Sequence, residues 1–306
     1  MTWQALGSSH SKNPDPSVLP GTNDAIHCTP DELLGLWRMT RINVRAALPR
    51  TPFDFDGGPS LPGRIRGALG HALRAISSTY ETTLALEAFY GPLPSWRPRA
   101  QIPRPFNITA ERRGGEISST LTLFGRIDIE RDILIRAFPM AFELGLSVDS
   151  RKGARREPLQ VIEANWTVTQ SVKPFQPLQD AILLFQTPYS FGTPEKPARS
   201  WDSMVVGLVE RVAGMALWNG IELRPDLGQW RRLGQTMTFD GHDLTLERWP
   251  RYSGRDNGQI REMIGYRGRL IIYRPPAVLW PYLALAETTF IGGNTALGLG
   301  RFDLLL

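Results

Sequence analysis

The sequence is poor in the residue types on which disulfide and metal chemistry depend. Cysteine occurs once in 306 residues, as Cys28, so no disulfide can form within the chain. This usage favours a reducing, cytoplasmic compartment. Histidine occurs four times, as His10, His27, His71 and His242, with no two at ligand spacing and no C-x-x-C pair beside them. The sequence therefore predicts neither a dedicated zinc site nor another metal centre, and it carries no cofactor motif.

Long hydrophobic runs are also missing. No uninterrupted apolar stretch approaches the length needed to cross a bilayer. The first seventeen residues, MTWQALGSSHSKNPDPS, lack a basic segment followed by an apolar one. We therefore expect neither export nor a membrane partner.

Lysine is the third scarce residue. The chain has 35 basic and 30 acidic residues, and its net charge of +5 is too small to identify a polyanion partner. Only four of the basic residues are lysines, at positions 12, 152, 173 and 196, so arginine supplies nearly all the positive charge. Arginine bridges two phosphate oxygens and stacks on unpaired bases, which lysine cannot do. The excess of arginine over lysine therefore suits a nucleic-acid partner, although a GC-rich genome would also produce it.

The length and the 42% hydrophobic content suit two domains. We expect a flexible or surface-wrapping segment over 1–30, an N-terminal domain over 31–172 and a C-terminal domain over 173–306. Hydrophobic patterns predict strand, helix, strand pair, helix and strand in the first domain, and the same order in the second. This is the order of a ferredoxin-like unit, so the expected class is α+β with two tandem ferredoxin-like, RRM-like domains. The named segments are 33–47, 60–78, 116–124, 132–144 and 159–168, then 181–186, 201–217, 242–248, 267–273 and 278–286.

Residues 60–78, SLPGRIRGALGHALRAISS, give the clearest helical pattern. At 100° per residue one side carries aliphatic residues, namely Ile65, Leu69, Ala72, Leu73 and Ile76. The other side carries Arg64, Gly67, His71, Arg74 and Ser78. The pattern predicts a helix that buries its aliphatic side and presents a basic, glycine-containing face. Thr29, ahead of a first strand-like segment, is a possible cap for a short helical turn.

The chain ends with FIGGNTALGLGRFDLLL, from Phe290 to Leu306. Four glycines remove side chains from this loop, so backbone N–H groups can approach a phosphodiester closely, and Arg301 follows as a cation. The apolar run after it predicts a final buried strand. A tight turn without a ligand is the alternative. The four glycines are Gly292, Gly293, Gly298 and Gly300.

Two further basic segments are candidate RNA contacts. The first is a loop containing Arg151, Lys152, Arg155 and Arg156, which as a charge run is equally typical of a solvated turn. The second is RWPRYSGRDNGQIR over 248–261, where cations and aromatic rings suit unpaired nucleotides. Its alternative is a hairpin anchored in the core by its aromatic residues. The candidate contacts in it are Arg251, Tyr252, Arg255 and Arg261.

Four motifs together resemble a known family. LPGRIRGALGHALR, LTLFGR at 121–126, WPRYSGR at 249–255 and IGGNTALGLGRF resemble the CRISPR-associated pre-crRNA-processing endoribonucleases of the RAMP superfamily. They follow the family's order between Leu61 and Phe302. The resemblance implies tandem ferredoxin-like domains, a terminal Gly-rich loop that contacts RNA, and metal-free cleavage of a CRISPR repeat transcript at a hairpin. It also implies that each crRNA keeps a 5′ handle.

Metal-free RNA scission needs a group that takes the 2′-hydroxyl proton, a proton for the departing 5′-oxygen and cations that stabilise the phosphorane, and it leaves a 2′,3′-cyclic phosphate. His71, with Arg64 and Arg74 on the same helix face, is the first candidate. Arg66, at the opening of the helix where several family members place a catalytic side chain, competes with it, and His27 is third. The alternative is that His71 only bonds a neighbouring strand.

Two functions follow from this reading. The first is an endoribonuclease for CRISPR repeat RNA, and the second is a noncatalytic crRNA-binding subunit of the same superfamily within an effector complex. The region from Ser77 to Trp96 lacks the cysteines that many family members carry, and this departure is compatible with the second. Nucleotide binding is a distant third, because no strand, GxxxxGK[ST] and helix sequence occurs.

Overall fold

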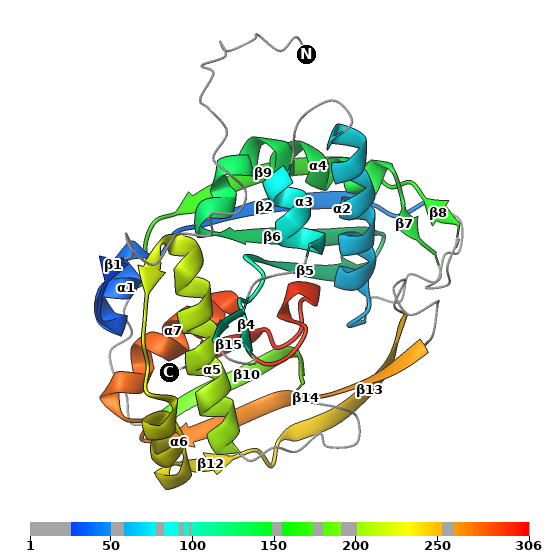
Figure 1. Cartoon of the computed structure of the whole chain (residues 1–306). Helices are drawn as coiled ribbons and strands as arrows, with labels where there is room; N and C mark the ends of the chain where they lie inside the picture. The colour runs from blue at the N-terminus through cyan, green and yellow to red at the C-terminus, as the bar shows by residue number, and fades with distance from the viewer. Residues whose placement is uncertain are drawn as a thin grey trace.

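The computed structural model describes residues 26–49, 58–77, 83–91, 95–97, 100–148, 155–173, 180–190, 201–252 and 260–305. Two antiparallel sheets, each with helices packed on one face, form a mixed architecture, which confirms the expected α+β class (Figure 1). Arg151, Lys152 and Arg255 lie outside the described residues.

The N-terminal unit is built on a four-stranded sheet in the order β5-β6-β2-β9, with every neighbouring pair antiparallel. In chain order this is 2-3-1-4, and helices join the first strand to the second and the third to the fourth. The elements are β2 (Met39–Ala47), α2 (Leu61–Ser77), α3 (Thr83–Tyr90), β5 (Phe106–Arg113), β6 (Glu116–Phe124), α4 (Arg131–Glu143) and β9 (Gln160–Thr169).

The C-terminal unit repeats this arrangement. Its sheet has the order β12-β14-β10-β15, with β13 also paired to β14, and in chain order it again reads 2-3-1-4. The elements are β10 (Asp180–Tyr189), α5 (Trp201–Ala216), α6 (Leu227–Thr236), β12 (Thr238–Asp240), β13 (Leu244–Tyr252), β14 (Ile260–Tyr273), α7 (Trp280–Thr289) and β15 (Phe302–Leu305).

Short elements complete the described part of the chain. Three two-stranded pairings are β1 (Ile26–His27) with β11 (Ile221–Glu222), β3 (Ser95–Arg97) with β4 (Ala100–Gln101), and β7 (Leu146–Ser147) with β8 (Arg156–Glu157). The 3₁₀ turns are η2 (Gly125–Glu130), η3 (Leu217–Asn219), η4 (Ala277–Leu279) and η5 (Thr295–Leu297), and one short helix, α1 (Pro30–Leu36), precedes β2.

Helix α2 has the predicted amphipathic character. The side chains of Ile65, Leu69, Ala72 and Leu73 are fully buried in the core of the N-terminal unit. Their spacing of three and four residues places them on the side that packs against α4 and β5, because the helix turns once every 3.6 residues. Burial of this aliphatic stripe explains why the segment folds as a helix in this position.

Helix α1 shows the predicted cap at Thr29. The Thr29 hydroxyl accepts from the Glu32 N–H at 3.3 Å, and the Glu32 carboxylate accepts from the Thr29 N–H at 2.7 Å, which is a capping box. Leu33 and Leu34 of α1 are buried in the core of the C-terminal unit, and β1 pairs with β11 of that unit. The beginning of the described chain therefore packs on the C-terminal unit before β2 enters the N-terminal sheet.

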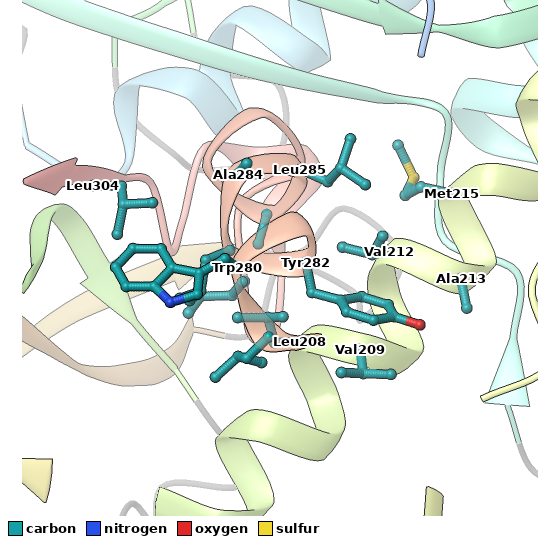
Figure 2. Close-up of a cluster of buried hydrophobic side chains, with 14 of the residues drawn as sticks. Leu208, Val209, Val212, Ala213, Met215, Trp280, Tyr282, Ala284, Leu285 and Leu304 are labelled. Atoms are coloured by element: carbon teal, nitrogen blue, oxygen red, sulfur yellow. The ribbon is translucent and has the colours of Figure 1, made fainter. Parts of the chain in front are cut away.

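The C-terminal core forms where α5 and α7 meet the sheet. Figure 2 shows Tyr282 of α7 beside Val209 and Val212 of α5, and Trp280 on the side of Leu304 of β15. All five side chains are buried or nearly so. Apolar residues surround most of α7, because the helix lies between α5, α1 and the sheet.

Hydrogen bonds join the two units along β5 and the segment just before it. The buried Asn107 amide donates to the Thr288 carbonyl at 2.9 Å, and the Trp218 indole donates to the Pro103 carbonyl at 2.8 Å. These contacts bring the end of α7, and the terminal loop after it, against the N-terminal sheet. Among the described helices, none is long and apolar enough to cross a membrane.

Candidate functional site

The solvent face of α2 carries the main candidate. The side chains of His71 and Arg74 are exposed, and Gly67 one turn earlier opens on free space. This confirms the basic, glycine-containing face that the helical pattern predicts. His71 is therefore accessible to a ligand.

Two arginines act on the His71 imidazole. Partial burial, followed by the charges of Arg156 and Arg74, lowers the pKa of His71 below its usual value. Arg156 belongs to β8, which reaches α2 through the β7–β8 hairpin. A cationic surround disfavours the imidazolium, so His71 is mostly neutral near pH 7 and its ring can accept a proton.

Arg64 makes its described hydrogen bonds to the strand beside α2. Its guanidinium donates to the Val148 carbonyl at 2.9 Å and to the Ser147 carbonyl at 3.4 Å. It thereby fixes β7 against α2. Arg74 and Arg156 are the charges that act on His71, whereas the Arg64 guanidinium is held by carbonyls beyond the helix.

Arg66 lies on another side of α2. Its guanidinium donates to the Phe89 carbonyl at 2.5 Å and lies over the rings of Tyr90 and Phe106, at 5.3 and 5.9 Å from their centroids. These contacts hold α3 and β5 against α2. Arg66 and His71 are therefore turned to different neighbours.

Tyr90 is a member of this region that the sequence pattern did not identify. Its hydroxyl donates to the Arg66 carbonyl at 2.5 Å, and its ring also lies 5.8 Å from the Arg74 guanidinium. A side chain at Gly70 would collide with this ring, so Gly70 provides the notch that Tyr90 fills. The Tyr90 ring thus helps to position the Arg74 guanidinium. In the sequence, the spacing of Arg66, Gly70 and Arg74 by four residues was the one signal that indicated a shared neighbour on this side of the helix.

The terminal loop reaches the start of α2, as the hypothesis of a shared RNA surface requires. Leu297 in η5 lies 4.0 Å from the position that a side chain on Gly63 would take, and Gly298 packs on Pro62 and on the Ile108 carbonyl of β5. Figure 1 shows the loop near the N-terminal end of α2, between the two units. The described contacts between the terminal loop and the start of α2 are largely aliphatic.

The glycines of this loop serve backbone packing. Gly292, Gly298 and Gly300 have positive φ angles of 84°, 76° and 70°, which other residues rarely adopt. The N–H groups of Gly293, Gly298 and Gly300 donate to the carbonyls of Ser190, Thr295 and Pro188 at 2.7, 2.9 and 3.0 Å. The expectation that these N–H groups face a phosphate is therefore wrong, because they bond within the protein.

Arg301 is held in a similar way. Its backbone N–H donates to the Thr187 hydroxyl at 2.9 Å, and its guanidinium lies 3.3 Å from the Glu111 carboxylate of β5. Arg113 shares the same carboxylate at 2.8 Å. The pair is partly exposed, so Arg301 keeps access to solvent while its charge is offset by Glu111.

The other candidates are dispersed. Arg155 is exposed and paired with Glu157 at 3.3 Å, whereas the β13–β14 register sets Arg251 opposite Arg261 and Tyr252 opposite Ile260. Trp249 of the same ribbon is buried, in agreement with a core-anchored hairpin. His27 is exposed on β1 in the C-terminal unit, apart from α2. Within the described residues, no three His, Cys, Asp or Glu side chains form a group that could hold a metal.

Comparison with known proteins gives a structural likeness without a sequence match. No family model matches the sequence. No curated protein matches it either. A Cas6 product complex has a TM-score of 0.52 at 17% identity and covers 88% of this chain and 100% of the solved one. A second Cas6 product complex, of the Thermus thermophilus protein, has a TM-score of 0.56 at 16% identity and covers 87% and 99%. The chain therefore has the fold of Cas6 proteins, in agreement with the resemblance in its motifs.

Proposed function

We propose that the protein is a Cas6-type endoribonuclease that binds CRISPR repeat RNA and cleaves the precursor into crRNAs with a 5′ handle. One observation carries the proposal: an exposed histidine, His71, lies among Arg74 and Arg156 on a helix whose start contacts the terminal loop. The fold and the complexes of its structural relatives support the RNA partner. The two 2-3-1-4 units support two ferredoxin-like domains. We assign them to 31–172 and 173–306, with α1 at the start of the first range packed on the second unit.

The reaction we propose needs no metal. Neutral His71 accepts the proton of the 2′-hydroxyl, and the 2′-oxygen attacks the adjacent phosphorus. The bond from phosphorus to the 5′-oxygen breaks, this oxygen takes a proton from solvent, and a 2′,3′-cyclic phosphate remains. Arg74 and Arg156 offset the additional negative charge of the phosphorane. The charges that keep His71 neutral thus also favour the anionic transition state.

The RNA surface we propose runs from this group along α2 to the terminal loop. Arg301 and Arg113 flank the loop, and each forms an ion pair with the Glu111 carboxylate. Arg64 and Arg66 contribute by fixing β7 and α3, since both donate to protein carbonyls. Gly292, Gly293, Gly298 and Gly300 shape the loop. Arg251, Tyr252, Arg261 and the basic loop that includes Arg155 remain proposed outer contacts of the repeat.

Cleavage of a labelled CRISPR repeat RNA in excess EDTA tests the proposal. We expect one discrete cut that yields a 2′,3′-cyclic phosphate, and no cut in a control RNA with a single 2′-deoxyribose before the scissile phosphate. An RNA that is bound but left intact would instead identify a noncatalytic crRNA-binding subunit. Loss of cleavage in EDTA that Mg²⁺ restores would contradict the metal-free mechanism.

A further inference from the structure

Two glycines in the middle of α2 have different surroundings. A side chain at Gly70 would collide with the Tyr90 ring. At Gly67, apart from the adjoining residues and the helix backbone, no described residue comes within 4 Å of the position that a side chain would take. A glycine inside a helix lowers the stability of that helix. The Tyr90 ring explains the glycine at position 70, and no described contact explains the one at position 67.

The open surface over Gly67 has identifiable borders. Residues three and four positions away are the nearest neighbours on a helix surface. Around Gly67 these neighbours are Gly63, Arg64, Gly70 and His71. The surface over Gly67 therefore lies between the terminal loop, which contacts the start of α2, and the proposed catalytic base.

Two contacts border this surface toward the start of α2. Leu297 of the terminal loop lies 4.0 Å from the position of a side chain at Gly63. The Arg64 guanidinium donates to the Val148 carbonyl at 2.9 Å, which holds it against the β7–β8 hairpin. It does not reach within 4 Å of the space over Gly67. Arg64 is thus a side wall of the open surface and does not cover it.

His71 and Tyr90 border the surface on the other side. Tyr90 fills the notch at Gly70, and its hydroxyl donates to the Arg66 carbonyl at 2.5 Å. The exposed His71 follows Gly67 by one helical turn, yet its ring also stays more than 4 Å from the space over Gly67. The proposed base therefore stands beside an open patch of helix backbone.

The chemistry requires such a patch. A general base must lie within hydrogen-bond reach of the proton that it removes, so the ribose that carries the attacking 2′-hydroxyl must lie next to the His71 ring. A sugar can approach a helix backbone closely only where no side chain stands between them. Position 67 meets this condition within one turn of His71.

We propose that the ribose of the nucleotide before the scissile phosphate lies over Gly67, between the His71 imidazole and the terminal loop. This placement rests on the proposed function and adds to it the seat of the reacting sugar. Gly67 is then a contact of the substrate, although it has no side chain to take part in the reaction.

Substitutions of increasing size at Gly67 test the placement. Gly67→Ala and Gly67→Leu introduce residues that favour a helix, so both should raise the denaturant midpoint. Both should slow single-turnover cleavage at saturating protein, Gly67→Leu by about tenfold or more, because the sugar is displaced from the base. Gly35→Ala and Gly35→Leu in α1 are matched controls with unchanged cleavage, since Gly35 is exposed and no described residue comes within 4 Å of its side-chain position.

The combination of higher stability and slower cleavage separates this role from a structural one, because a damaged fold would lower both. Cleavage by Gly67→Leu at the wild-type rate would overturn the placement and leave the proposed function intact. A wild-type chain that binds the repeat RNA and leaves it uncut would contradict the proposed function, and the placement with it.

Disulfide trapping tests the placement without a rate measurement. In a Cys28→Ser background, Gly67→Cys should form a disulfide with a repeat RNA that carries a short 2′-linked thiol on the nucleotide before the mapped cut, because disulfides need closely spaced partners. Gly35→Cys should not react with this RNA, nor Gly67→Cys with an RNA whose thiol lies several nucleotides away. Equal trapping by Gly67→Cys at both RNA positions would overturn the placement.

Discussion

The Cα of Gly298 faces the carbonyl oxygen of Ile108 so closely that a side chain at Gly298 would collide with it. One residue belongs to the terminal loop of the C-terminal unit and the other to β5 of the N-terminal unit. The close approach of the terminal loop to β5, and with it to the start of α2, therefore requires a residue without a side chain at this position.

Gly298→Ala tests this packing. The positive φ of Gly298 costs an alanine about 1–2 kcal/mol, and the collision with Ile108 and Pro62 adds about 1–3 kcal/mol. We expect a lower denaturant midpoint. Gly115→Ala is the control, because a side chain at Gly115 meets open space. Equal stability of the two variants would mean that the loop relaxes freely.

Arg211→Ala tests how the end of α7 is held. The Arg211 guanidinium donates to the Thr289 carbonyl at 2.9 and 2.7 Å and to the Phe290 carbonyl at 2.9 Å, just before the glycine loop. A cation at a helix C-terminus also offsets the dipole. Loss of these bonds should destabilise folding by about 2–4 kcal/mol in denaturant unfolding. Arg232→Ala, at an exposed site on α6, should have little effect.

His71→Ala tests the catalytic assignment. General base catalysis contributes about 10²–10⁴ in rate, so single-turnover cleavage should slow by at least that lower factor while RNA affinity is retained. His27→Ala is a matched control, because His27 is also exposed but lies on β1. A wild-type cleavage rate in His71→Ala, measured in the same assay, would exclude His71 as the base.

Arg156→Gln tests the tuning of His71. Burial first, then Arg156 and Arg74, lower the pKa of His71, so removal of Arg156 should raise that pKa. A base must be unprotonated, and the rate therefore rises with pH through its pKa. In the variant this rise should move to higher pH, with the greatest loss of rate on the acidic side. Arg155→Gln is the control, since Arg155 is not among the causes of the shift. A pH profile that coincides with wild type would contradict the coupling.

Arg301→Gln tests the loop cation. If Arg301 contacts a phosphate, removing its charge should reduce the slope of log affinity against log salt by about 0.7. Glu111→Gln should act in the opposite direction, because Glu111 balances both Arg301 and Arg113. Binding isotherms at several salt concentrations measure both. Unchanged slopes in both variants would assign the pair to packing between the units.

The sequence predicted most elements because their signals are local. The aliphatic repeat of α2, the apolar alternation of β6 and the cap at Thr29 depend on residues a few positions apart. Strand β5 and helices α3 and α6 were not located. Strand β5 mixes polar and apolar residues because it is the edge strand of its sheet and contacts the other unit, and α6 is short and polar. Their structure depends on distant partners.

The sequence by itself determined an α+β chain with an amphipathic basic helix that exposes His71 and Arg74, because a 3.6-residue period fixes which side chains share a face. Only the tertiary structure decided what surrounds them. It brought Arg156 to His71 from a hairpin some eighty residues away, turned Arg64 and Arg66 to protein carbonyls, and used the loop glycines for close packing. Charges and carbonyls far apart in the chain meet only after folding, so no local pattern encodes their pairing.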